Sequence, residues 1–192
     1  MNSKILDRYE ITSDNRFIID VNIPEPDELF ETYDENASFY KKDLNPRFEG
    51  YLLDCVQEIG LKNKFIIRIG LPKVQAEKTD EGEILYGFKQ YFEYCILICK
   101  KEIKTISMRM LLHLGLACSV LVLLMVFHFA NSGATASFTG LLMTGLSAAV
   151  WVLLLTGFSR FLFRTLSQRS DIKIYRALKN SPVNFVFRGV EA

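Results

Sequence analysis

Fifty consecutive residues, 110–159, contain no Asp, Glu, Lys or Arg, although these residue types make up 23% of the chain. The stretch holds two apolar runs, residues 110–129 and 138–159. Each is long enough to cross a bilayer as a helix, because about 20 residues rise about 30 Å. Residues 130–137 between them are small and polar and suit only a turn. We therefore expect a hairpin of two membrane-spanning helices. The alternative is a buried helical hairpin in a soluble domain.

Charge is distributed unevenly around this stretch. Residues 1–99 contain 12 Lys and Arg against 19 Asp and Glu, a net charge of −7, whereas residues 100–192 contain 11 against 3, a net charge of +8. By the positive-inside rule, both chain termini are expected in the cytoplasm, and the basic flanks attract anionic lipid headgroups. These flanking residues are Lys100, Lys101, Lys104, Arg109, Arg160, Arg164, Arg169 and Lys173.

Residues 1–82 have the pattern of a small cytosolic α/β domain. Apolar and polar residues alternate over 16–23 and again over 64–71, which predicts two strands. Acidic residues after Pro26 predict a short helix over residues 27–33. Asn45 and Pro46 are a good cap and first position for a second helix that Gly60 ends. Because this helix lies between the two strands, we expect a parallel pair.

A long helix is expected to join this domain to the membrane. Apolar residues recur at helical spacing from Ile84 into the first span, and no Pro or Gly interrupts Phe88 to Leu114. One continuous helix is therefore predicted from residue 83 to residue 129, with residues 83–109 as the connecting segment.

The chain end is expected to return to the domain. Residues 160–178 continue the second span as a helix, Pro182 follows its end, and residues 183–188 alternate as a third strand. This strand needs a sheet to join, so residues 160–192 would complete the sheet of the same subunit or of a neighbour. The predicted fold is an α+β membrane protein, a two-helix transmembrane hairpin plus a small α/β domain of about three strands.

Several short motifs carry a resemblance to a known group. They are residues 16–21 (RFIIDV), residues 27–30 with 33–34, residues 41–44 (KKDL), and residues 174–178 followed by Val183. With them the chain resembles a widespread bacterial family of small two-span membrane proteins with a cytosolic α/β head, whose function is uncharacterised. The resemblance implies a bacterial inner-membrane location and a periplasmic turn at residues 130–137. It implies no activity.

Reactive side chains are few, which argues against most enzyme classes. Both histidines, His113 and His128, fall in the first span, so the head has no imidazole for a triad or a metal site, and no glycine-rich phosphate motif is present. We assign no catalytic residue, no metal site and no cofactor. The enzyme alternative is a metal-dependent carboxylate enzyme, and an acidic solvated surface is the simpler interpretation. The carboxylates concerned are Asp20, Asp27, Glu28, Glu31, Asp34 and Glu35.

Three basic residues could bind a ligand on the head. Lys41 and Lys42 precede the predicted helix that begins near Arg47, and a helix N-terminus with cations suits a phosphate. Exposed loop lysines are the simpler interpretation.

Two sets of residues in the spans could line a pore or a subunit contact. A stripe on the first span carries both histidines, and small residues share a face of the second. The alternative is that the histidines bond to headgroups and backbone at the interfaces. Because two spans seldom bury their own polar faces, we expect a homo-oligomer. The sets are His113, Ala117, Leu121, Leu124 and His128, and Gly140, Thr144, Ser147 and Ala148.

Two functions fit these expectations. The first is a homo-oligomeric inner-membrane effector or channel, gated by a ligand or partner on its cytosolic domain. Its specific form is a nucleotide or oligonucleotide signal in anti-phage defence. The second is a non-catalytic membrane-anchored scaffold whose acidic head recruits a cytosolic protein partner.

Overall fold

The computed structural model describes residues 3–31, 42–77, 80–130 and 137–188. The chain divides into two compact units, one of residues 1–98 with 171–192 (the head) and one of residues 99–170 (the hairpin). The elements, in order, are α1 Ser3–Leu6, β1 Phe17–Asn22, the 3-10 helix η1 Pro26–Leu29, α2 Pro46–Ile59, β2 Phe65–Pro72, the 3-10 helix η3 Lys73–Gln75, α3 Glu81–Ala130, α4 Ser137–Asn180 and β3 Val183–Arg188.

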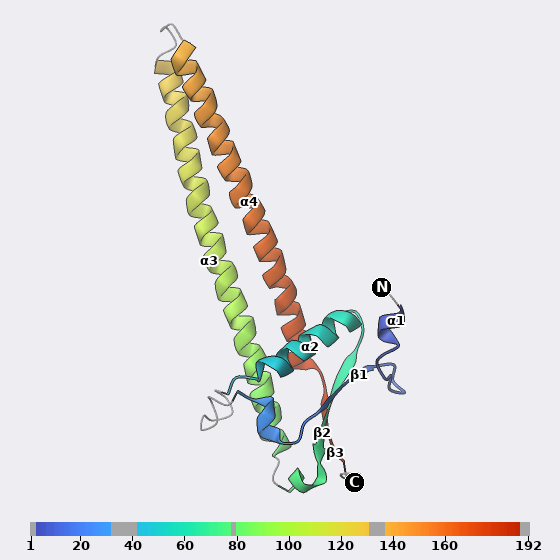
Figure 1. Ribbon diagram of the computed structural model, residues 1–192. Helices are drawn as coiled ribbons and strands as arrows, with labels where there is room; N and C mark the ends of the chain where they lie inside the picture. Colours follow the sequence, from blue (N-terminus) through green and yellow to red (C-terminus); the bar gives the residue numbers. More distant parts are fainter. Residues whose placement is uncertain (1–2, 32–41, 78–79, 131–136, 189–192) are drawn as a thin grey trace. The chain divides into compact units, whose positions relative to one another are not determined.

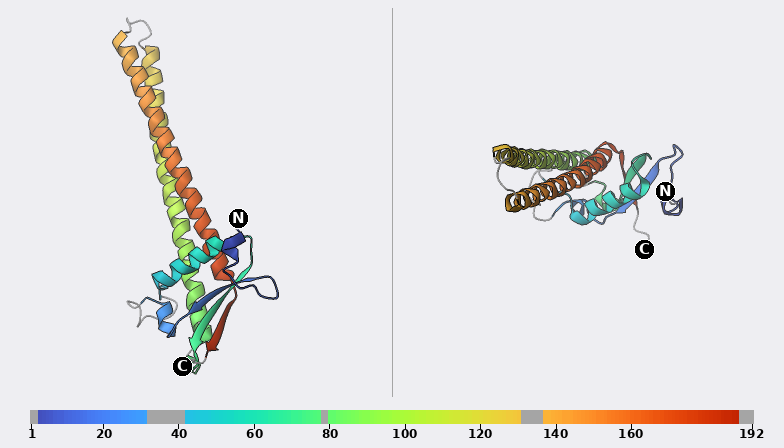
Figure 2. Two further views of the ribbon diagram at one scale, coloured as in Figure 1. Left: turned by 45° about the vertical axis from the view of Figure 1, so that its right-hand side comes forward. Right: turned by 90° about the horizontal axis from the view of Figure 1, so that it is seen from above.

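The head contains a three-stranded parallel sheet in the order β1-β2-β3 (Figures 1 and 2). Ile19 of β1 is opposite Ile67 of β2, and Ile67 is in turn opposite Val183 of β3. The predicted parallel pair and the predicted third strand are therefore confirmed, and the chain end completes the sheet within the same chain. The fold is therefore α+β, and β2 is the middle strand of the sheet.

One face of the sheet supplies the core. Alternate residues of β2 (Phe65, Ile67, Ile69 and Leu71) are buried in one cluster with residues of α2, α3 and α4. Residues of α2, α3 and α4 contribute to the core on that face. The opposite face is mixed: Ile18 and Ile66 are buried there, beside the charged pair Asp20 and Arg68.

Local signals explain the bounds of α2. The Asn45 side chain accepts a hydrogen bond from the Arg47 backbone N–H, and Pro46 occupies the first turn, where its missing N–H costs nothing. Gly60 ends the helix with a φ of 81°, a conformation that glycine adopts without strain.

Helix η1 is shorter than the predicted helix over 27–33: it ends at Leu29, and Phe30 is extended and bridged to Leu44.

Helix α3 is continuous from Glu81 to Ala130, as the unbroken apolar periodicity predicts. It begins two residues before the expected start because Asp80 caps it, with its Oδ1 2.9 Å from the Gly82 nitrogen and 3.1 Å from the Glu83 nitrogen. Helix α4 is likewise a single helix, so the second span and the helix after it are one element. The turn predicted over 130–137 falls mostly outside the described residues.

Both helices are long and apolar enough to cross a membrane by length and composition. Of the most apolar window of each, only 0% and 6% of residues are buried within the chain. An apolar helix that its own protein leaves uncovered is typical of a lipid-facing segment and not of a soluble core. The low burial of these apolar segments favours the two-span interpretation over the buried hairpin.

Within the hairpin, covered positions recur on one line of each helix. On α4 the buried or half-buried residues Val150, Leu154, Phe161, Thr165 and Gln168 follow one another at spacings of four, seven, four and three residues. On α3 Glu102 marks the corresponding line, because its carboxylate accepts a hydrogen bond of 2.8 Å from the Gln168 side-chain nitrogen. This heptad-like spacing is typical of two helices packed side by side.

Candidate functional site

The head contains a hollow of about 390 Å³ between the N-terminal segment, β1 and α2. Nine residues line it: Arg8, Tyr9, Glu10, Ile18, Asp20, Tyr51, Asp54, Cys55 and Glu58. We call it the acidic hollow, because four of these residues are carboxylates and one is a cation. Even with Arg68, which pairs with two of these carboxylates, the hollow keeps a net negative charge and favours a positively charged group over an anion.

Local structure brings the N-terminal segment to the edge of β1. Asn15 has a φ of 58° and closes a turn in which the Thr12 hydroxyl accepts a hydrogen bond of 3.1 Å from the Arg16 nitrogen. The turn lets Ile11 bridge to Phe17 in antiparallel fashion, and the Ile18 nitrogen donates to the Glu10 carbonyl oxygen. This pairing places Glu10 beside the first strand.

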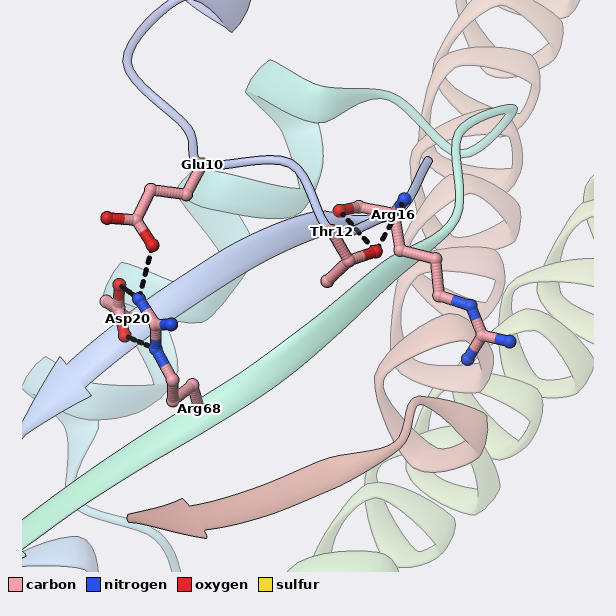
Figure 3. Close-up of polar contacts among 5 residues, drawn as sticks. All are labelled: Glu10, Thr12, Arg16, Asp20 and Arg68. Atoms are coloured by element: carbon pink, nitrogen blue, oxygen red, sulfur yellow. Dashed lines mark hydrogen bonds and ion pairs between the residues drawn. The ribbon is translucent and has the colours of Figure 1, made fainter. Parts of the chain in front are cut away.

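Arg68 of β2 holds two of the carboxylates in place (Figure 3). Its guanidinium donates two hydrogen bonds to the two Asp20 oxygens and one of 2.6 Å to Glu10. Asp20 and Arg68 are opposite each other in the parallel register. The hydrogen bonds from Arg68 hold the pKa of the Asp20 carboxyl below its ordinary value of 3.8. Asp20 is therefore a fixed negative charge in the lining of the hollow.

Two tyrosines shape the hollow. The Tyr9 hydroxyl donates to Glu58 at 2.7 Å, and the Tyr51 hydroxyl donates to the Asp20 backbone oxygen at 3.0 Å. Burial raises the pKa of both hydroxyls, with Tyr51 at about 12, and the neighbouring Cys55 and the carboxylates add to the increase. Both tyrosines consequently stay protonated and neutral.

The predicted anion site stays a prediction, because one of its three residues, Lys41, lies outside the described residues. Lys42 is 8% exposed, its Nζ lies 3.9 Å from an Asp27 oxygen, and it sits 5.7 Å from the centre of the Phe30 ring. Arg47 is exposed at the start of α2, and Lys41 lies outside the described residues. The exposed-loop interpretation of Lys42 is thus wrong, because its ammonium is paired inside the head.

The span residues lie in different surroundings. Ala117, Leu121 and Leu124 are half-buried in the hairpin, whereas His113 is exposed and its Nδ1 is 2.6 Å from the Arg109 carbonyl oxygen. The side chain of His128 lies outside the described residues.

The small-residue face of the second span is largely uncovered. Gly140, Thr144 and Ala148 are exposed, Ser147 is half-buried, and the Thr144 hydroxyl donates to the Gly140 carbonyl oxygen at 2.9 Å. The role of both sets in a pore or subunit contact stays a prediction.

The carboxylates considered for a metal lie in different surroundings where the structure describes them. Asp20 is held by Arg68 and Asp27 lies near Lys42, while Asp34 and Glu35 lie outside the described residues. Over residues 3–31, 42–77, 80–130 and 137–188, no group of three His, Cys, Asp or Glu could hold a metal ion.

Arg68, Tyr9 and Tyr51 were not anticipated as site residues. A signal for Arg68 exists, because each of the two predicted strands carries one central charged residue, and these charges are opposite in sign. The tyrosines carry no such signal, since their hydroxyl partners are 31 and 49 residues away in sequence.

Comparison with known proteins adds no relative. No family model matches this chain, and neither the curated proteins nor the solved structures compared with it give a match.

Proposed function

We propose that this chain is a two-span membrane effector of the bacterial inner membrane. A ligand or partner binds its cytosolic head, and the two long helices convert binding into a change of a homo-oligomeric membrane assembly. The observation that carries the proposal is that α3 and α4 each belong to both units. Phe88 and Phe92 of α3 and Leu178 of α4 are buried in the head core, and the same two helices form the uncovered apolar hairpin.

Continuity of the helices supports coupling between binding and the membrane. An uninterrupted helix transmits a rotation or a translation along its length, since its backbone hydrogen bonds resist bending. A ligand that repacks the head core would act directly on the ends of both helices.

The acidic hollow indicates the chemistry of the signal. Its carboxylates repel phosphates, which disfavours a nucleotide there, and attract Lys or Arg side chains. We therefore favour a basic segment of a cytosolic protein as the signal. The nucleotide-signalled form of anti-phage defence stays the alternative signal, and it requires a site elsewhere on the head.

Ion flux from vesicles tests the proposal. Full-length protein in zwitterionic vesicles is exposed on its head side to a lysine- and arginine-rich peptide, to an oligonucleotide or to cytosolic extract. We expect flux with the basic peptide, lost in the variant Asp54→Asn/Glu58→Gln and kept in the matched control Glu25→Gln/Glu81→Gln. Flux triggered by the oligonucleotide alone would favour the nucleotide signal. Flux that no addition changes would refute a gated effector.

The scaffold is the second candidate, and the same hollow favours it. A scaffold binds the basic partner without any conductance. Binding of the peptide that Asp54→Asn/Glu58→Gln weakens, with silent vesicles, would select the scaffold over the effector.

A further inference from the structure

We propose that the hairpin carries a binding site for the phosphate groups of anionic phospholipids. The site consists of seven exposed basic residues, which we call the basic collar: Lys100, Lys101, Lys104, Arg109, Arg160, Arg164 and Arg169. The inference rests on the proposed function in one respect, since it requires the hairpin to be inserted in a bilayer.

Ion pairs within the chain do not neutralise the collar. In the head Arg8, Lys42, Arg68 and Lys179 each have a carboxylate within 4 Å. Across the described part of the hairpin, residues 99–130 and 137–170, no collar residue has such a partner. The one carboxylate there, Glu102, accepts its hydrogen bond from Gln168 instead. The collar is therefore a positive surface that the chain itself does not neutralise.

The spacing of the collar residues places like charges next to each other, which favours binding of an anion. Lys100 and Lys104 are four residues apart on α3, and Arg160 and Arg164 are four residues apart on α4. Side chains at this spacing lie next to each other on a helix, and two like charges there destabilise it unless an anion lies between them. Between Arg160 and Arg164 this anion is a phosphate group, which arginine can bind with two parallel hydrogen bonds.

Uncovered apolar residues show how deep the arginines lie. On α4 the exposed apolar surface does not stop at Ser159: Phe163 is 76% exposed and Leu166 is 60% exposed. Because lipid is the medium that would cover such residues, Arg160 and Arg164 lie along the lipid-contacting part of α4. Their guanidinium groups reach the headgroup layer by extending along the helix. Arg109 of α3 lies in the same way beside the exposed Met108.

Depth divides six of the seven collar residues into two sets of equal charge; Arg169, ten residues from the uncharged stretch, is in neither set. Arg109, Arg160 and Arg164 lie within five residues of the uncharged stretch, about 8 Å along a helix, and would contact phosphates directly. Lys100, Lys101 and Lys104 lie six to ten residues away, about 9–15 Å, and would act mainly through their field, which salt screens over about 8–10 Å.

Lipid selectivity of the full-length protein tests the site. Phosphatidylglycerol and phosphatidylcholine compete for the protein in mixed bilayer nanodiscs, and native mass spectrometry counts the retained lipids. We expect wild type to prefer phosphatidylglycerol. The variant Arg109→Gln/Arg160→Gln/Arg164→Gln should lose this preference by at least about tenfold, and Lys100→Gln/Lys101→Gln/Lys104→Gln by less than about threefold. Equal losses, or no preference in wild type, would overturn the proposal.

Three further arms separate the causes of failure. Inorganic phosphate at 10-fold excess over lipid should not displace phosphatidylglycerol, and displacement would show a free-phosphate site instead. If the variant Arg109→Gln/Arg160→Gln/Arg164→Gln does not insert, Arg109→Lys/Arg160→Lys/Arg164→Lys replaces it. The lipid selectivity of this replacement should lie between that of wild type and that of Lys100→Gln/Lys101→Gln/Lys104→Gln. Selectivity equal to wild type would then overturn a bidentate phosphate site. A wild-type chain that alkaline carbonate extracts from every membrane would refute the proposed membrane function itself.

Discussion

Replacing Phe92 by Ala tests whether the long helix α3 is part of the head core. Phe92 is 0% exposed, and its ring centre lies 4.8 Å from that of Phe88, 5.4 Å from that of Tyr91 and 5.9 Å from that of Tyr175 on α4. A buried Phe→Ala change costs about 3–5 kcal/mol, and three aromatic neighbours place the cost near the middle, about 4 kcal/mol. The unfolded fraction of the head would rise about a thousandfold.

Pulse proteolysis in urea measures this free energy on the detergent-solubilised full-length protein, since cleavage of the head reports its unfolded fraction. Tyr94→Ala is the matched control on the same helix: Tyr94 is 55% exposed, and its loss should change the free energy of unfolding by no more than about 0.5 kcal/mol. Two variants within about 1 kcal/mol of each other would show that α3 does not pack in the head as described.

Three further substitutions have defined outcomes. Asp20→Asn should lower head stability at pH 7 by about 1–2 kcal/mol, because it loses the charged hydrogen bonds from Arg68. The folded pKa of Asp20 lies below 3.8, so its contribution is present above about pH 4 and lost as the pH falls through the folded value; urea midpoints of wild type and variant should converge in acid. Asn45→Ala should cost about 1 kcal/mol in the same assay by removing the acceptor for the Arg47 N–H, and Asn45→Asp should restore it. Thr165→Val should stabilise the hairpin by about 1 kcal/mol in a detergent-unfolding titration, since the buried Thr165 hydroxyl has no partner among the described residues; a loss of stability would contradict this reasoning.

Elements set by neighbouring residues were predictable from the sequence. The cap at Asn45, the proline after it and Gly60 fix the two ends of α2 within 16 residues of chain. The alternation over residues 183–188 likewise identifies β3, because a strand with one covered face has a period of two. The end of the chain could be assigned to the sheet of the head since an isolated strand has nothing else to pair with.

The site itself depends on partners that are distant in sequence. Lys42 is next to acidic and apolar residues that could equally leave it in solvent, and only the fold brings Asp27 and Phe30 to it. The acidic hollow likewise forms because Glu10, on a segment with no strong periodicity, is bridged to β1. Such positions follow from strand register, which the local pattern leaves open.

The order of synthesis determines when the sheet of the head can be completed. Ile67 of β2 pairs with Val183 of β3, which is synthesised after both long helices. One edge of β2 therefore stays unpaired in the growing chain until both helices have left the ribosome. A fragment of residues 1–98 also lacks Ile174 and Leu178, which are buried in the finished core. The sheet of the head is therefore completed only after β3 has been synthesised, and a chain interrupted before Val183 presents an open strand edge to proteases.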